Sequence, residues 1–281
     1  MGGALMIKAI QIPYNPLFEL KCQLAAKAGF RHIAVNFTEV TAKTQSQWEA
    51  VTEDICRILE ENSLQCIQSH PYYYDLMRSS ELVEEEHEFA IKQAVIASGK
   101  LGAAWCVLHP RTSLTTGRYV SASFEDNRKV FAEYLELACK YGTGIAAENL
   151  PVFGIKPAIP FYSSSFEDLA ALADSFHVPN MSICWDTGHA NLMSFDQAEA
   201  IRFLGNRIQC THIHNNFKQM DNHLPPDQGN ILWDKVMQSF ADIGYEGPLT
   251  LETHCCYTEP GLLESFAKHN FACLEYLEML M

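Results

Sequence analysis

Short apolar runs alternate along the chain with longer stretches whose apolar residues recur every three to four positions. The runs are rich in Val, Ile, Leu, Cys and Ala and show little alternation of polar and apolar residues, which is typical of parallel strands buried on both faces. Eight such runs predict strands at Ile7–Ile12, His32–Phe37, Leu64–His70, Ala104–His109, Gly144–Glu148, Ser182–Asp186, Ile208–His214 and Leu249–His254.

The stretches between the runs have the spacing and the boundaries of helices. Gln45–Glu61 is amphipathic, and Ser165 with Asp168 matches the N-cap and N3 positions of a capping box. Further helices are predicted from Pro16 to about Gly29, over Leu82–Leu101, over Phe124–Tyr141 and from about Leu232 to Gly244.

A strand followed by a helix, repeated eight times, predicts parallel strands joined by crossover helices. Eight such units in about 250 residues are the expected size of a (β/α)8 barrel, and no linker divides the 281 residues. We therefore predict a single TIM barrel domain over residues 1–281, with its active site at the C-terminal rim of the strands. A doubly wound open sheet is the structural alternative.

Composition narrows the class of protein further. The chain is 48% hydrophobic and 19% charged, so it is expected to be globular. Its formal net charge of −14 disfavours a broad basic surface and therefore a nucleic-acid partner. We find no apolar run of the ~18 residues that span a bilayer and no signal peptide at Met1–Lys8. The ten cysteines contain no CxxC pair, and a cytoplasmic protein without a membrane partner is expected.

Polar residues with metal-binding side chains stand at the carboxyl ends of the predicted strands. They recur at intervals of 39, 39, 38, 26 and 40 residues, close to one strand-helix unit each, so consecutive strands bring them to one rim. A buried strand end tolerates a carboxylate or an imidazole only with a partner, and a divalent cation is the simplest partner. The set is His70, His109, Glu148, Asp186 with His189, His212 with His214, and Glu252 with His254.

The distribution of the histidines supports this interpretation. Six of the eleven lie at predicted strand ends, and His223 follows the seventh strand. A single histidine of this kind is as often a core residue bonded to the backbone, but the joint set is not explained in that way. The remaining four are interpreted as ordinary surface or packing residues: His32, His87, His177 and His269.

Several segments carry a resemblance to a known family. They are Ala147-Glu148-Asn149, the run from Cys184 to Asn191 that reads C-W-D-T-G-H-A-N, the run T-H-I-H-N-N at Thr211–Asn216, the run D-N-H-L-P-P at Asp221–Pro226, and Leu251–His254. Together they resemble the xylose-isomerase-like barrel family over essentially the full length. That family contains sugar and sugar-phosphate isomerases and epimerases and also the endonuclease IV group of DNA-repair enzymes.

The resemblance implies a set of metal ligands. The four ligands typical of the epimerases correspond to Glu148, Asp186, His212 and Glu252. This oxygen-rich shell suits Mn²⁺, the first expectation, and also Mg²⁺ or Co²⁺, and it tolerates Zn²⁺. The positions of the three-zinc site of endonuclease IV are matched as well, by His70 and His109 for one further ion and by His189, Asp221 and His223 for another.

The resemblance also implies an activity, a divalent-metal-dependent isomerisation or epimerisation of a sugar or sugar phosphate through an enediolate. Glu148 and Glu252 would move the proton next to the carbonyl, and His189 would stabilise the developing charge. Lys218 stands where the ketose epimerases usually have an arginine, which leaves the sugar open. The other residues expected to bind substrate are His70, His109, Trp105 and Tyr72.

Two other activities remain open at this stage. An apurinic-site endonuclease with three zinc ions would use the additional ligands, although the acidic charge disfavours it. A lyase of the inosose-dehydratase type would share the fold and the metal ligands. The sequence also leaves open association into a homo-oligomer.

Overall fold

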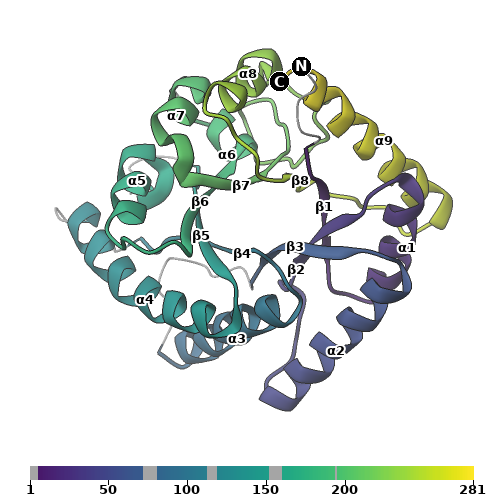
Figure 1. The fold of residues 1–281 in the computed structure, drawn as a ribbon, viewed down its shortest axis with the longest axis horizontal. Helices are drawn as coiled ribbons and strands as arrows, with labels where there is room; N and C mark the ends of the chain where they lie inside the picture. Colours follow the sequence, from purple (N-terminus) through teal and green to yellow (C-terminus); the bar gives the residue numbers. More distant parts are fainter. Residues whose placement is uncertain (1–5, 72–80, 113–118, 152–159, 194) are drawn as a thin grey trace.

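A computed structural model describes residues 6–71, 81–112, 119–151, 160–193 and 195–281 of the chain. Eight parallel strands lie side by side in the order β7-β6-β5-β4-β3-β2-β1-β8, which is the sequence order closed on itself (Figure 1). The strands are β1 (Lys8–Pro13), β2 (His32–Asn36), β3 (Gln65–His70), β4 (Trp105–Leu108), β5 (Gly144–Glu148), β6 (Met181–Asp186), β7 (Ile208–His212) and β8 (Leu249–Leu251).

The sheet closes between β7 and β8. The amide of Ile213 donates to the carbonyl of Thr250 at 2.7 Å, and the amide of Glu252 donates to the carbonyl of Ile213 at 3.1 Å. Each strand therefore pairs with its neighbour in sequence, and the last approaches the seventh. This arrangement confirms the predicted (β/α)8 TIM barrel and excludes the doubly wound sheet, whose strand order reverses at a switch point.

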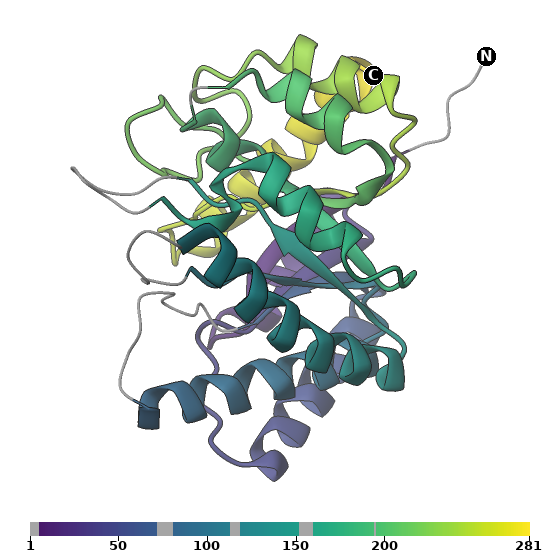
Figure 2. The same cartoon turned by 90° about the vertical axis from the view of Figure 1, so that its left-hand side faces the viewer.

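The helices surround the barrel, as Figures 1 and 2 show. The predicted helices are found with boundaries shifted by a few residues, and the helix of the eighth strand-helix unit, for which no bounds were predicted, is α9. The α-helices of the described residues are α1 (Phe18–Ala28), α2 (Gln45–Glu61), α3 (Glu81–Lys100), α4 (Tyr119–Tyr141), α5 (Phe166–Asp174), α6 (Thr187–Asn191), α7 (Gln197–Leu204), α8 (Trp233–Asp242) and α9 (Pro260–Met279).

The main core lies between the strands and the helices. Large side chains such as Trp48, Phe18 and Phe131 are almost fully buried there. The inside of the barrel holds a smaller cluster made of Val107, Ala146, Cys184 and Cys210. All ten cysteines are unpaired, as expected from their spacing.

Two predicted strands end two or three residues earlier in the structure. β7 ends at His212 rather than at His214, and β8 ends at Leu251 rather than at His254. The reason lies in the hydrogen bonds, because the amide of His254 donates to the carbonyl of His223, in the loop after β7, at 3.0 Å. The apolar pattern continues past the point where the backbone leaves the sheet.

In the described part of the chain, a helix with the length and apolar character that a bilayer requires is absent.

Candidate metal centre

The C-terminal ends of the strands bring four acidic and imidazole groups to one point. Glu148, Asp186 and His212 are the last residues of β5, β6 and β7, and Glu252 directly follows β8. One donor atom from each of the four lies within 4.8 Å of the others. His212 Nδ1 is 2.8 Å from Glu252 Oε2 and 3.1 Å from Glu148 Oε1. We call these four residues the central set.

The donors of the central set fit a divalent cation. Glu148, Asp186 and His212 are at most 1% exposed, and the Glu252 side chain is 12% exposed. Among the described residues, every ion-pair partner of Glu148 and Asp186 is a histidine, so no Lys or Arg neutralises these carboxylates. Three buried carboxylates need compensating charge, and three oxygen donors with one imidazole suit Mn²⁺, Mg²⁺, Co²⁺ or Zn²⁺.

The chain after β6 positions two of the functional groups at once. Asp186 is the N-cap of α6, and its Oδ1 accepts a hydrogen bond from the His189 amide at 2.6 Å. Asn149 fixes the backbone of Asp186, because its Oδ1 accepts from the Asp186 amide at 2.7 Å and its Nδ2 donates to the Asp186 carbonyl at 2.9 Å. Asn149 was not predicted as a site residue, although it directly follows Glu148.

Glu148 is shared between two sets of ligands. Its Oε1 lies 3.1 Å from His212 Nδ1 and 3.3 Å from His189 Nδ1. Its Oε2 lies 3.1 Å from His109 Nε2 and 3.3 Å from His70 Nε2. His70, His109 and Glu148 therefore form a second candidate set, as the resemblance implied. A carboxylate with one oxygen facing each set has the arrangement of a bridging ligand.

A third set lies on the other side of the central set and comprises His189, His214, Asp221 and His223. Asp221 Oδ2 is 3.2 Å from His189 Nε2 and 3.0 Å from His223 Nε2. His214 Nε2 lies 3.0 Å from an Asp186 carboxylate oxygen, which links this set to the central one. The sequence placed His214 in the set at the strand ends, but none of the ligand sets implied by the resemblance included it.

Gly188 leaves room for the ring of His214. A Cβ at Gly188 would lie 1.9 Å from Cε1 of the His214 ring. We expect Gly188→Ala to destabilise the protein by about 1–3 kcal/mol, because an overpacked site must displace a buried ring. The matched control is Gly261→Ala, where nothing lies within 4 Å and the residue is helical. Urea unfolding of both variants measures the difference, and equal stabilities would contradict the packing argument.

The charges of the three sets are strongly coupled. Burial alone would raise the pKa of Glu148, but His212 and His109 outweigh it and hold the pKa well below its usual range. Burial likewise opposes the charge on His212, yet the carboxylates of Glu252 and Glu148 raise its pKa well above the usual value. Against burial, Asp221 raises the pKa of His223 to about 9. Without an ion, the raised pKa values of His212 and His223 therefore favour imidazolium groups beside the carboxylates.

Metal binding is expected to release protons at pH 7.5. A ligand imidazole must be neutral, whereas His212 is protonated in the metal-free protein because its pKa is raised. One ion in the central set should displace about one proton, and affinity should rise with pH until the imidazole is neutral. Calorimetric titration with Mn²⁺ in two buffers of different ionisation enthalpy measures the number. The control is His177→Asn, at an exposed position in left-handed backbone, which should release the same number of protons as the wild-type protein. Equal binding enthalpies in both buffers would refute the prediction.

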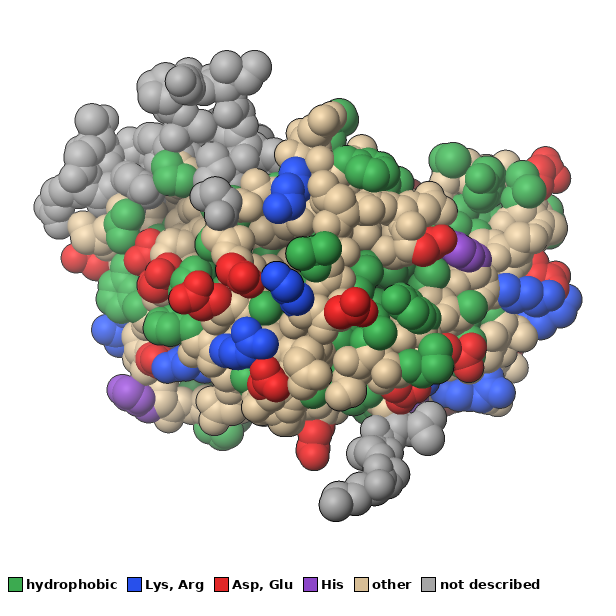
Figure 3. Space-filling model, turned by 90° about the horizontal axis from the view of Figure 1, so that it is seen from above, with side chains coloured by type: hydrophobic (Ala, Val, Ile, Leu, Met, Phe, Trp, Pro, Cys, Tyr) green, Lys and Arg blue, Asp and Glu red, His purple; other side chains and the backbone are tan. Residues whose placement is uncertain are grey.

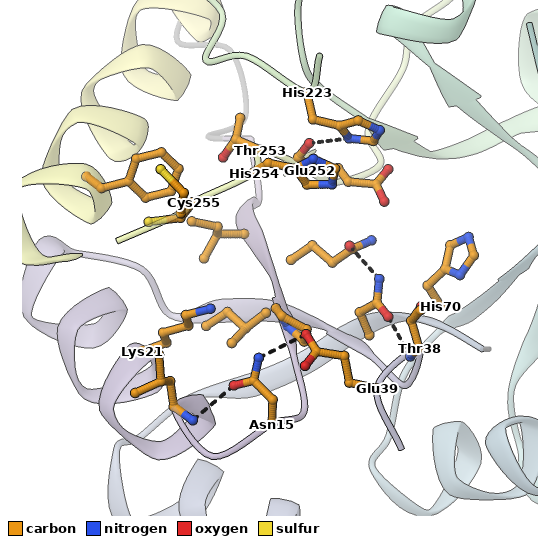
Figure 4. A pocket seen from close by; sticks show the side chains of 18 of the residues that line it. Asn15, Lys21, Thr38, Glu39, His70, His223, Glu252, Thr253, His254 and Cys255 are labelled. Atoms are coloured by element: carbon orange, nitrogen blue, oxygen red, sulfur yellow. Dashed lines mark hydrogen bonds between the residues drawn. The ribbon is translucent and has the colours of Figure 1, made fainter. Parts of the chain in front are cut away.

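The three sets open into one cavity of about 550 Å³. Figure 4 shows Glu252, His223 and His254 on one side of it and Asn15, Lys21 and Glu39 on the other. The wall between α1 and α9 is apolar and includes Leu24, Leu263, Phe266 and Ala267. Lys21 is the sole Lys or Arg among the described lining residues. It was not predicted, because it lies on a helix rather than at a strand end.

Two of the described residues that were predicted to bind substrate, Trp105 and Lys218, do not line this cavity. Trp105 is the first residue of β4 and lines a separate hollow with Gly205 and Pro248, so the strand directs it to the other end of the barrel. Lys218 is exposed and lines a hollow beside Asn191 and Leu232. Tyr72 lies outside the described residues. His70 and His109 do line the cavity.

The fold agrees with the family comparison. The chain belongs to the xylose isomerase-like TIM barrel family, whose model matches residues 22–269. An uncharacterized protein of Methanocaldococcus jannaschii is 30% identical over 169 residues, which cover 58% of this chain and 55% of that protein. The D-psicose 3-epimerase of Enterocloster bolteae is 29% identical over 86 residues, which cover 31% and 27%. The chain thus spans about half of the first relative and less of the second.

Solved structures of sugar epimerases share the fold. A D-tagatose 3-epimerase-like protein superposes with a TM-score of 0.72 at 20% identity and covers 96% of this chain and 98% of its own. The 3-keto-D-glucoside 4-epimerase of E. coli superposes with a TM-score of 0.73 at 15% identity and covers 98% and 100%. At these identities the likeness establishes the barrel, and activity must be argued from the site.

Proposed function

We propose that the protein is a divalent-metal-dependent isomerase or epimerase of a sugar or sugar phosphate. One observation carries the proposal: two carboxylates, Glu148 and Glu252, flank one imidazole of the central set and both line the same cavity. Proton transfer next to a carbonyl needs carboxylates held close to an electrophilic centre. A bound divalent ion would supply Lewis-acid polarisation of the substrate carbonyl and neutralise enediolate charge.

The roles of the residues follow from their positions. Glu148 and Glu252 accept and return the proton at the carbon next to the carbonyl, one from each face in an epimerase. His189 lies 3.3 Å from Glu148 and 3.2 Å from Asp221, so an oxygen of the substrate in this position would meet an imidazole N–H. His70 and His109 contact the other oxygen of Glu148 and line the cavity, where they would bind substrate hydroxyls. Mn²⁺ is the proposed ion, because three of the four donors are carboxylates.

The size and charge of the cavity favour a small, weakly charged substrate over a polyanion. A cavity of about 550 Å³ lies in the range that holds drug-sized ligands, so it has room for more than one sugar ring. Duplex DNA binding depends on many Lys and Arg contacts, and the described lining supplies Lys21. On the side of the barrel seen in Figure 3, basic and acidic side chains are interspersed rather than segregated. The unpaired cysteines support a reducing, cytoplasmic location.

A second candidate is favoured by the bridging position of Glu148. Three adjacent ligand sets offer places for three ions, and the second and third sets are rich in imidazole, which suits Zn²⁺. Clustered cations stabilise the attacking and leaving oxygens of a phosphodiester. Cleavage at an apurinic site by an endonuclease IV-like mechanism is therefore the alternative function that this geometry favours.

The deciding experiment combines metal counting with an exchange assay. The purified protein, loaded with Mn²⁺, is incubated in deuterated water with a panel of ketoses and ketose phosphates, and a Zn²⁺-loaded preparation is incubated with an oligonucleotide that contains an abasic site. We expect deuterium next to the carbonyl of at least one sugar, loss of exchange with EDTA, and one ion in the central set. Nicking of the oligonucleotide with about three zinc ions would support the alternative, an unsaturated ketone would indicate a dehydratase, and no exchange with any sugar would refute the proposal.

A further inference from the structure

A separate cluster of metal-type side chains lies between α9 and the loop that follows β7. His269 and Cys273 are one turn apart on α9, and Asp227 belongs to the loop. We propose that Asp227, His269 and Cys273 form a separate metal site, outside the three sets at the barrel centre, that binds Zn²⁺ or a similar borderline-soft divalent ion. The sequence pattern had placed His269 among the ordinary surface histidines.

The three donor atoms face one another rather than separate partners. Asp227 Oδ1 lies 2.9 Å from His269 Nε2 and 3.6 Å from Cys273 Sγ, and Sγ lies 3.7 Å from the same Nε2. Tetrahedral zinc with bonds of about 2.3 Å to sulfur and about 2.0–2.1 Å to nitrogen and oxygen places sulfur about 3.6 Å from each lighter donor. The two observed distances from sulfur match this expected separation. The nitrogen–oxygen distance is that of a hydrogen bond and would widen by a few tenths of an ångström.

The same geometry argues against a nucleophilic triad. In a triad the histidine presents one ring nitrogen to the nucleophile and the other to the carboxylate. Here a single nitrogen, Nε2, faces both Cys273 and Asp227. Convergence of three donors on one point is the arrangement of a cation site.

The ligands are held in place before an ion arrives. Asp227 lies in a turn in which the Gln228 amide donates to the Pro225 carbonyl at 2.9 Å. The carbonyl of Pro226 accepts from Asn215 Nδ2 and Trp233 Nε1, both at 2.7 Å. Cys273 is 7% exposed, whereas the side chains of His269 and Asp227 are 43% and 52% exposed, which leaves solvent access for the ion and for a water as fourth ligand.

An ion at this position would connect two parts of the enzyme that shape the main cavity. The loop after β7 also carries Asp221 and His223 of the third set, and α9 lines the cavity through Phe266 and Ala267. We therefore assign the site a structural role, in which the ion fastens the loop to α9. Its thiolate ligand gives it a preference for softer metals than the central set, because hard ions such as Mg²⁺ and Mn²⁺ favour oxygen.

Cobalt titration tests the proposal directly. The three sets at the barrel centre contain no sulfur, so a thiolate-to-cobalt charge-transfer band reports a cysteine ligand. Reduced, metal-free full-length protein is titrated with Co²⁺ and the near-ultraviolet spectrum is followed. We expect the band to appear in the wild-type protein, to be lost in Cys273→Ser and in His269→Ala, and to persist in Cys139→Ser, an exposed cysteine on α4.

The two loss variants protect the test from misfolding. Cys273 is buried and its replacement can disturb packing, whereas His269 is on the surface, so circular dichroism should show an unchanged fold for His269→Ala. The absence of the band in the wild-type protein would overturn the proposal. Its survival in Cys273→Ser, or its loss in Cys255→Ser at the mouth of the main cavity, would do the same. The outcome does not depend on any catalytic assay.

Discussion

Replacing Glu148 with glutamine is expected to lower turnover by about 10²–10⁴-fold, the range for loss of a positioned acid–base group, and to lower metal content as well. Glu148 is 1% exposed, and its two oxygens face four imidazoles, those of His70, His109, His189 and His212. Glutamine keeps the shape but offers one acceptor oxygen and an NH₂ group that cannot bind a cation. Isotope exchange in the sugar assay and elemental analysis of the same preparation measure the two effects.

The control for this prediction is another glutamate-to-glutamine change. Glu246 is exposed and lines the hollow at the opposite end of the barrel with Trp105. Glu246→Gln should keep both turnover and metal content. If Glu148→Gln retained its metal and most of its activity, the central set would not be the catalytic centre, and the proposed function would lose its main support.

The barrel could be predicted because its determinants are local and repeated. Each strand is a short apolar run, and each helix has a periodic apolar face, so eight repeats define the order without knowledge of the packing. The ends of β7 and β8 were overestimated, because apolar pattern does not show where a backbone leaves the sheet. The pairing of β1 with β8 joins positions at opposite ends of the chain, Ile10 with Leu251, and only the folded chain shows its register.

The candidate site could be predicted only where it follows from strand ends. Glu148, Asp186 and His212 end their strands, and their convergence is a consequence of parallel topology. Trp105 does not line the main cavity, because it begins β4 rather than ending it, and the sequence alone placed it within a longer run. Lys21 and Asp227 depend on how helices pack against the rim, which no spacing along the chain encodes.

Under the proposed function, Glu252 is the residue at which an epimerase and an aldose–ketose isomerase would differ. In a two-base epimerase, Glu148 and Glu252 face opposite sides of the reacting carbon, so each abstracts the proton from one epimer only. In a one-base isomerase, a single carboxylate carries the proton between neighbouring carbons. Glu252 is the most exposed member of the central set, and its Oε2 lies 2.8 Å from His212 Nδ1. Because the two mechanisms differ in whether they need a second carboxylate, a change at Glu252 separates them.

Glu252→Gln is therefore expected to lower epimerisation by about 10²–10⁴-fold while leaving solvent exchange in one of the two epimers. The epimer whose hydrogen faces Glu148 should still take up deuterium, because that base is intact, and the other epimer should not. Each epimer is supplied separately to metal-loaded protein, and deuterium is followed by mass spectrometry at equal metal content. Glu252→Asp, which keeps the carboxylate, should restore part of the epimerisation. Exchange in both epimers would assign the second base elsewhere, and loss of exchange in both with the metal retained would favour the one-base isomerase.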